Sequence, residues 1–393
     1  MMKRAKATRA IHGRRDGQYR SSVYPIYQSA SFAVQDSDEY DKYLRGEEEF
    51  YIYSRQHNPT VRNVEERLAA LENAEDGALF ASGMAAITSA ILSVVQAGDT
   101  VAALKSLYGT TYRFLKQVAP RLGIQTVFLD DDQLYQLHRH VPEAKLVYFE
   151  TPINPTCRCL SIERVVEAAR EMGAATIMDN TFASPINQNP MDYGVDIVVH
   201  SATKYMGGHG DVVAGAAAGS KARMNAAREQ RTMFGGCLNP QEAFLLDRSL
   251  KTLEMRVKQH NANALALAEF FAQERNVRQV YYPGLPDSPD HAIAEAQMRG
   301  FGGMLCIELA SLDAAKTLCD SLEVALNATS LGAVETLVSI PVLTSHAFMS
   351  DDELRAAGVT PGMVRISAGV EDINDLITDF KQALTQYATQ VHH

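Results

Sequence analysis

Short apolar runs alternate with amphipathic segments through the middle of the chain. This alternation is typical of a parallel sheet covered by helices. Several of the runs are apolar throughout, as expected of strands that are buried on both faces. The pattern predicts strands at Thr100–Leu104, Gln125–Leu129, Lys145–Glu150, Thr176–Asp179, Asp196–His200 and Val212–Ala218. We therefore expect a large α/β domain with a mainly parallel sheet.

Helical patterns lie between and after these runs. Ser161–Met172 begins with a candidate serine N-cap, and Gly173 follows it. Pro240–Arg275 predicts a long helix, with at most one interruption, that could bridge two domains. Beyond it the pattern predicts strands at Val277–Tyr282, Met304–Leu309 and Met363–Ser367, and helices at Asp313–Ser321 and Asp372–Tyr387. We expect an N-terminal arm (1–58), the large domain (59–248) and a smaller α+β C-terminal domain (249–393).

One segment could be mistaken for a membrane span. Gly77–Gly98 contains no charged residue and is long enough to cross a bilayer. Its serines, threonine and glutamine, with glycine at both ends, favour a buried helix instead.

Composition narrows the classes of partner. The 393 residues include 37 Lys and Arg against 47 Asp and Glu, which gives a net charge of −10. This charge disfavours nucleic acid and membrane partners, because both are anionic. The 5 cysteines have no zinc-site spacing, so we expect no metal and read them as free thiols of a cytoplasmic protein. The basic N-terminus lacks a following apolar run, and we expect no secretory signal; the terminal His392 and His393 are left out as a possible tag remnant.

Two polar residues stand just after predicted strands, where open parallel sheets bind ligands. Lys204 follows Ser201 and Thr203 and precedes Gly207. An apolar pocket would lower the pKa of this lysine and make it a nucleophile or Schiff-base former, whereas the alternative is an ordinary surface lysine. Asp179 ends the strand before it, so both residues would lie at one sheet edge. Asp179 is either a turn residue or a counter-ion for a protonated pyridine nitrogen.

Two further segments suggest anion recognition. Ser82-Gly83-Met84 opens an uncharged helix whose free N–H groups could cradle a phosphate, although small residues at a helix start also serve packing. No dinucleotide-binding or P-loop glycine pattern is present in the sequence. Arg365 follows a short apolar run and could bind a substrate carboxylate, or form a salt bridge with Glu371 or Asp372.

Together these residues indicate a known family: nearly the whole chain resembles the Cys/Met-metabolism family of pyridoxal-phosphate enzymes. The motifs that carry the resemblance are Tyr53-Ser-Arg55-Gln-His-Asn58-Pro59, Glu150-Thr-Pro-Ile-Asn154-Pro, Asp179-Asn-Thr-Phe and Ser201-Ala-Thr-Lys204-Tyr. The resemblance implies an aspartate-aminotransferase-like (fold type I) large domain that binds pyridoxal 5′-phosphate. It also implies a small amino-acid substrate and a homodimer with shared active sites, assembled as a dimer of dimers.

The resemblance also implies a role for each matched residue. Lys204 would hold the cofactor as a Schiff base and shuttle protons, and Asp179 would contact the pyridine nitrogen. The cofactor phosphate would lie on Gly83, Met84, Ser201 and Thr203, and on Tyr53 and Arg55 contributed to the neighbouring subunit. Tyr108 would stack on the cofactor ring and act as acid and base at the leaving group. Asn154, Ser330 and Arg365 would bind the substrate carboxylate, and Arg113 its distal part.

The implied reaction is elimination or replacement at the γ-carbon of a sulfur amino acid or homoserine ester, as in cystathionine γ-lyases and cystathionine γ-synthases. Arg113 and Thr110 favour that type over methionine γ-lyase. Against it, Ile52 and Thr329 replace carboxylates that cystathionine-handling members share. A methionine γ-lyase, an O-acylhomoserine sulfhydrylase and a replacement with an unusual nucleophile remain alternatives, as does a binding protein that retains only the fold.

Overall fold

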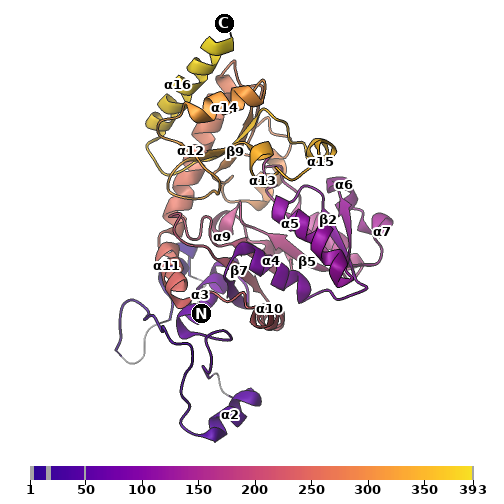
Figure 1. Ribbon diagram of the computed structural model, residues 1–393, viewed down its shortest axis with the longest axis vertical. Helices are drawn as coiled ribbons and strands as arrows, with labels where there is room; N and C mark the ends of the chain where they lie inside the picture. Colours follow the sequence, from indigo (N-terminus) through magenta and orange to yellow (C-terminus); the bar gives the residue numbers. More distant parts are fainter. Residues whose placement is uncertain (1–3, 15–18, 48–49, 392–393) are drawn as a thin grey trace.

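The structure is a computed structural model that describes residues 4–14, 19–47 and 50–391. His392 and His393 lie outside the described residues. The long axis of the molecule runs from the N-terminal arm, through a large α/β unit, to a smaller unit that ends in α16 (Figure 1). The domain boundaries at 58/59 and 248/249 stay predictions.

The large unit is built on a seven-stranded sheet in the order β1-β7-β6-β5-β4-β2-β3. The strands are β1 (Asp76–Phe80), β2 (Thr100–Leu104), β3 (Gln125–Leu129), β4 (Ala144–Glu150), β5 (Ala175–Asp179), β6 (Ile197–Ser201) and β7 (Gly215–Gly219). The five from β3 to β6 are mutually parallel, and β7 and β1 are antiparallel to their neighbours. The mainly parallel sheet is therefore confirmed.

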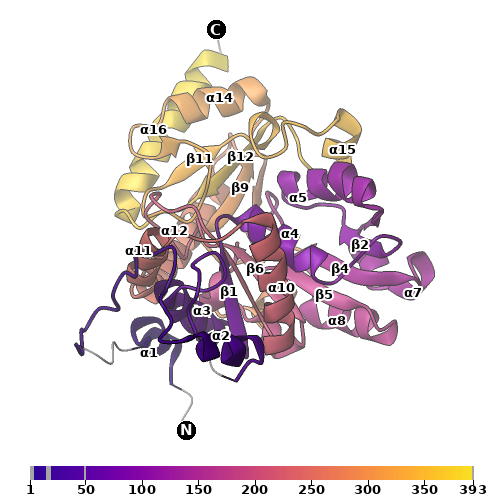
Figure 2. The same cartoon turned by 60° about the horizontal axis from the view of Figure 1, so that its bottom comes forward.

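Helices cover both faces of this sheet. They are α3 (Pro59–Glu72), α4 (Gly83–Leu92), α5 (Gly109–Arg113), η1 (Phe114–Val118), η2 (Ala119–Leu122), α6 (Asp131–Leu134), α7 (Leu137–His140), α8 (Ile162–Glu171), α9 (Ser184–Asn187), η3 (Pro190–Tyr193) and α10 (Lys221–Phe234). In Figure 2, α4 and α10 lie on one side of β1 and α3 lies on the other. Alternate residues of β1 belong accordingly to two separate apolar clusters, Ala78 and Phe80 to one and Leu79 to the other.

The buried helix expected in Gly77–Gly98 is present but is shorter than this segment. The first four residues of the segment belong to β1, and the helix occupies only Gly83–Leu92. An apolar run can be buried either as a strand or as a helix, so hydrophobicity alone does not distinguish a short buried strand from a buried helix. Along the described chain, no helix is both long and apolar enough to cross a membrane.

The smaller unit begins after the paired helices α11 (Pro240–Leu250) and α12 (Leu253–Gln273), which confirm the interrupted long helix. Its five-stranded sheet has the order β10-β11-β12-β9-β8. The strands are β8 (Gln279–Tyr281), β9 (Met304–Glu308), β10 (Leu326–Asn327), β11 (Leu337–Ser339) and β12 (Met363–Ser367). The helices are α13 (His291–Gln297), α14 (Leu312–Asp320), η4 (Pro341–Leu343), α15 (Asp351–Ala356) and α16 (Ile373–Val391).

The N-terminal segment carries α1 (Lys6–Ile11), which packs on α3 and α12, and α2 (Ser37–Leu44). Figure 1 shows α2 on an extended loop that projects from the large unit. Tyr53 and Arg55 lie where this loop returns to α3. The side chain of Asn58 caps α3 by accepting a hydrogen bond from the backbone N–H of Thr60.

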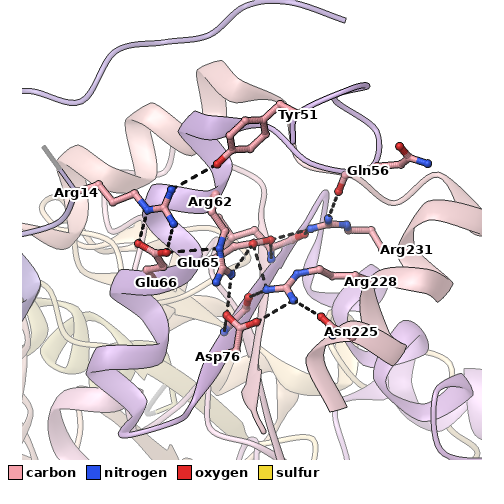
Figure 3. Close-up of polar contacts among 12 residues, drawn as sticks. Arg14, Tyr51, Gln56, Arg62, Glu65, Glu66, Asp76, Asn225, Arg228 and Arg231 are labelled. Carbon is pink, nitrogen blue, oxygen red and sulfur yellow. Dashed lines mark hydrogen bonds and ion pairs between the residues drawn. The ribbon is translucent and has the colours of Figure 1, made fainter. Parts of the chain in front are cut away.

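A buried ion network fixes the return of the arm (Figure 3). Glu65 of α3 is 2% exposed and accepts hydrogen bonds from Arg231, at 2.8 Å, and from the backbone N–H of Leu79, at 3.1 Å. Arg231 also donates to the carbonyl of Gln56 at 2.6 Å, within the turn that follows Arg55. The network thus joins α3, β1 and α10 to that turn. Its Arg228 lies 2.9 Å from the carboxylate of Asp76.

Candidate active site

A cavity of about 560 Å³ lies where the large sheet meets the smaller unit. The carboxyl ends of β4, β5 and β6 and the N-terminal end of α4 form its floor, as expected for an open parallel sheet. Ten of the predicted site residues line it: Lys204, Tyr108, Asp179, Gly83, Met84, Ser201, Thr203, Asn154, Ser330 and Arg365. Tyr53, Arg55 and Arg113 do not line it.

The end of the cavity beside α4 has the features of an oxyanion cradle. Ser82 caps α4 through a hydrogen bond from the backbone N–H of Ala85, and Gly83 and Met84, the first residues of the helix, line the cavity. A Cβ on Gly83 would lie 2.8 Å from the Cβ of Ser201, so only glycine allows this close approach. The hydroxyl of Thr203 is bonded to the backbone of Ala214.

Lys204 lies part-buried in the middle of the cavity. Its Nζ donates a hydrogen bond to Ser330 Oγ at 2.7 Å. Burial, together with the positive charge of Arg365, lowers the pKa of Lys204 to about 8. A substantial fraction of this lysine is therefore neutral and nucleophilic close to physiological pH.

Two carboxyl groups lie side by side at the ends of adjacent parallel strands. Asp179 of β5 is in register with Glu150 of β4, and both line the cavity. Burial raises the pKa of Asp179, against the effect of a hydrogen bond from Thr181. Burial and the neighbouring Asp179 raise the pKa of Glu150 to about 8. Neither carboxyl forms an ion pair within the described part of the chain, so the cavity can stabilise a cation here.

Glu150 was missed as a site residue. It accepts hydrogen bonds from the backbone N–H of Tyr108, at 3.0 Å, and of Asn154, at 3.2 Å. It therefore joins the two loops that carry those side chains. The signal that identified Asp179, a polar residue that ends an apolar strand, applies equally to Glu150 at the end of Lys145–Glu150.

Arg365 lies on β12 at the roof of the cavity and is only 6% exposed. Its guanidinium donates to Asn154 Oδ1 at 3.2 Å and to the carbonyl of Ser330 at 2.9 Å. The alternative salt bridge does not form, because Glu371 accepts hydrogen bonds from Thr336 instead. Among the described residues Arg365 has no carboxylate partner, which is the arrangement expected of a group that binds an anionic ligand.

Arg113 is not among the residues that line the cavity. Its guanidinium is stacked on the ring of Phe348, 4.7 Å from the ring centroid, and it lines a separate space of about 30 Å³. Phe348 itself lines the main cavity, together with Thr110, Val213 and Leu343. The part of the cavity nearest Arg113 is therefore walled by uncharged side chains.

Tyr53 and Arg55 lie on the surface of this chain. Tyr53 is 44% exposed, and the guanidinium of Arg55 is 5.6 Å from the centre of its ring. Arg55 also donates to the carbonyl of Thr232 at 3.0 Å, near the end of α10. Both side chains are thus held in place without a contact to the cavity of their own chain.

Comparison with known proteins agrees with this geometry. The Cys/Met metabolism PLP-dependent enzyme family matches residues 7–385. The chain belongs to this family. L-methionine γ-lyase of Fusobacterium nucleatum subsp. nucleatum is 39% identical over 390 residues, which cover 98% of this chain and 99% of the relative. Cystathionine β-lyase MetC of Bacillus subtilis is 40% identical over 385 residues, with 97% and 96% covered.

The fold comparison points to the same Cys/Met metabolism family. A cystathionine γ-synthase from Xanthomonas oryzae pv. oryzae, in complex with aminoacrylate and cysteine, superimposes with a TM-score of 0.92. It is 35% identical, and the match covers 98% of this chain and 99% of that one. The protein is thus a pyridoxal-phosphate-dependent enzyme of fold type I that acts on sulfur amino acids or their precursors by elimination or replacement.

The residues of the cavity fit the family cofactor. The close approach of Gly83 to Ser201 beside the N-terminal end of α4 leaves backbone N–H groups for a phosphate. Asp179 and Glu150, which lack cationic partners in the described chain, suit a protonated pyridine nitrogen. Lys204 lies in the same cavity with a lowered pKa, as a Schiff-base lysine requires.

Proposed function

We propose that the enzyme acts at the γ-carbon of an amino acid whose γ-substituent is short and lacks a second α-amino-acid group. Methionine, homocysteine and homoserine esters whose acyl group carries no charge belong to this class. The observation that carries the proposal is the position of Arg113, which is stacked on Phe348 outside the cavity. Because the Arg113 side chain is not part of the cavity wall, the wall nearest Phe348 has no charged side chain that could bind the distal carboxylate of cystathionine.

Two sequence features support this choice. Thr329 lines the cavity where cystathionine-handling relatives are expected to have a carboxylate, and Ile52 replaces a second one. A distal ammonium group would therefore also lack a partner. Cystathionine is the second candidate substrate, since an exposed arginine such as Arg113 can change rotamer when a carboxylate is present.

The cofactor-binding residues follow from the fit described above. The N–H groups of Gly83 and Met84, with Ser201 and Thr203, would hold the phosphate, and Asp179 would keep the ring nitrogen protonated. Tyr108 would stack on the ring. When bound, pyridoxal phosphate supplies an electron sink for negative charge that develops on the substrate carbons.

The other cavity residues would orient the substrate and move its protons. Arg365 and Asn154 bind the α-carboxylate, and Ser330 orients Nζ of Lys204 through its hydroxyl. Lys204 removes the proton from the substrate Cα once its amine is free. The hydroxyl of Tyr108 donates a proton to the departing γ-substituent.

We further propose that two copies of the chain share their active sites. Tyr53 and Arg55 are exposed, anchored by α10 and absent from the cavity of their own chain, so they are available to a phosphate in a neighbouring subunit. A dimer of such dimers and a cytoplasmic location remain expectations. The free thiols of all five cysteines agree with a reducing compartment.

A substrate comparison tests the proposed specificity. The kcat/KM for release of α-ketobutyrate is measured with methionine, homocysteine and cystathionine, and cystathionine formation is measured with O-succinylhomoserine and cysteine. We expect turnover of substrates with short substituents to exceed that of cystathionine. A higher kcat/KM for cystathionine would refute the proposed specificity. In a separate assay, borohydride should trap the cofactor on Lys204, and Lys204→Ala should abolish turnover while the chain stays folded.

A further inference from the structure

A second cavity, of about 450 Å³, lies on the large unit between α1, α9 and α12. It shares no lining residue with the active-site cavity. Lys6 and Arg9 enter it from α1, and Arg299 enters it from the loop after α13. The side chains of Asn187 and Asn189 complete its polar wall. We propose that this cationic cavity binds a phosphate group, either free phosphate or a phosphomonoester, independently of the proposed function.

Three of the four cations that line this cavity form no ion pair among the described residues. Lys6, Arg9 and Arg299 form no ion pair with any carboxylate of the described chain. They donate instead to neutral oxygens: Lys6 to the carbonyl of Pro185, Arg9 to that of Ala70, and Arg299 to that of Ile186 at 3.1 Å. By contrast, the buried arginines of the network in Figure 3 all pair with Glu65 or Asp76.

The three positive charges also disfavour one another. Burial, followed by the charge of Arg299, lowers the pKa of Lys6 to about 7. Burial lowers the pKa of Arg9, the carboxylate of Asp192 acts against this, and Arg299 adds to the lowering. The buried Nε of Arg9 has no hydrogen-bond partner among the described residues. An anion in the cavity would relieve this repulsion.

Three carboxylates lie near the cavity, and each already has a partner. Asp192 accepts hydrogen bonds from Asn73, and its charge favours the protonated forms of Lys6 and Arg9. Glu254 lines the cavity but is paired with Lys258 at 2.7 Å. Glu72 accepts hydrogen bonds from Asn180 and Asn189 and contacts His200. The geometry therefore favours a ligand with more than one negative charge. Guanidinium groups match the oxygens of phosphate in pairs, and the volume leaves room for a substituent on the phosphate.

The test measures phosphate binding to the enzyme with its cofactor in place and excess pyridoxal phosphate removed, because free cofactor is itself a phosphomonoester. Equilibrium dialysis uses inorganic phosphate and, in a second arm, glycerol 3-phosphate, at constant ionic strength. We expect saturable binding of one or both probes, at one site per chain. Binding of only one probe identifies which form of phosphate the cavity accepts.

Lys6→Met and Arg299→Met should each weaken this binding by about tenfold or more, because each removes a charge-assisted hydrogen bond. Lys316→Met, an exposed lysine on α14 outside the cavity, serves as the matched control and should bind as wild type does. The absence of saturable binding in the wild type would overturn the proposal. So would variants that lower the melting temperature but bind phosphate unchanged, since the cations would then serve only to cap helix carbonyls.

Discussion

Replacing Arg365 with lysine tests how the enzyme binds the substrate carboxylate. The variant keeps the positive charge but loses the planar fork that donates two parallel hydrogen bonds. A hydrogen bond to a charged group contributes about 1.5–3 kcal/mol, so the loss of one such bond lowers kcat/KM by roughly 10- to 150-fold. Because the carboxylate is held throughout the reaction, we expect most of this change in KM.

The assay is steady-state release of α-ketobutyrate, with the absorption band of the bound cofactor recorded to show that the site remains intact. Arg113→Lys is the matched control, because Arg113 lies outside the cavity and its change should alter kcat/KM by less than about threefold. A wild-type KM in Arg365→Lys would refute the role of this residue. Equal losses in both variants would show that Arg113 enters the cavity when substrate binds.

Three further predictions concern ionisation, stability and assembly. The pKa of Glu150 is raised to about 8 in the folded chain, so ionisation of this carboxyl destabilises the wild type as the pH rises from about 4.5 to 8. Glu150→Gln lacks this ionisation, and the difference between its melting temperature and that of the wild type should therefore shift in favour of the variant across this range. Glu65→Ala should lower the free energy of unfolding by about 3–5 kcal/mol in urea titrations, because it leaves buried arginines unpaired. As a control, Glu66→Ala on the exposed side of the same helix should lower it by less than about 1 kcal/mol. Mixing inactive Tyr53→Phe and Lys204→Ala subunits should restore part of the activity in hybrids, and an inactive mixture would argue against shared sites.

Much of the fold could be predicted from periodicity. The strands β2 and β3 have the predicted limits, and Ser161 caps α8 through the backbone N–H of Arg164. The errors fall where an apolar run fits two structures. β1 lies in the segment where a buried helix was expected, and β7 begins at Gly215 and not at Val212. The residues Val212–Ala214 are apolar but form the loop whose Ala214 binds the hydroxyl of Thr203, a tertiary contact that periodicity does not encode.

The candidate site also contains residues whose position the sequence predicts and residues whose position it does not predict. The rule that ligands bind at the carboxyl ends of parallel strands identified Asp179 and Lys204, because both follow directly from strand positions. The role of Arg113 at the distal part of the substrate stays a prediction. In the structure its side chain stacks on Phe348, from a distant part of the chain. The direction of a flexible arginine depends on which partner the fold brings to it, and the sequence around Arg113 contains no information about Phe348.

Ser330 connects the two units at the point where the chemistry must be aligned. Its hydroxyl accepts a hydrogen bond from Lys204 of the large unit, and its carbonyl accepts one from Arg365 of the smaller unit. The backbone of Ser330 has a φ of 86°, a left-handed conformation that costs free energy for a residue other than glycine. That conformation directs the carbonyl and the hydroxyl towards different partners. The spacing between the reactive amine and the carboxylate-binding guanidinium is therefore set by one residue, so a shift of the smaller unit would move the substrate relative to Lys204.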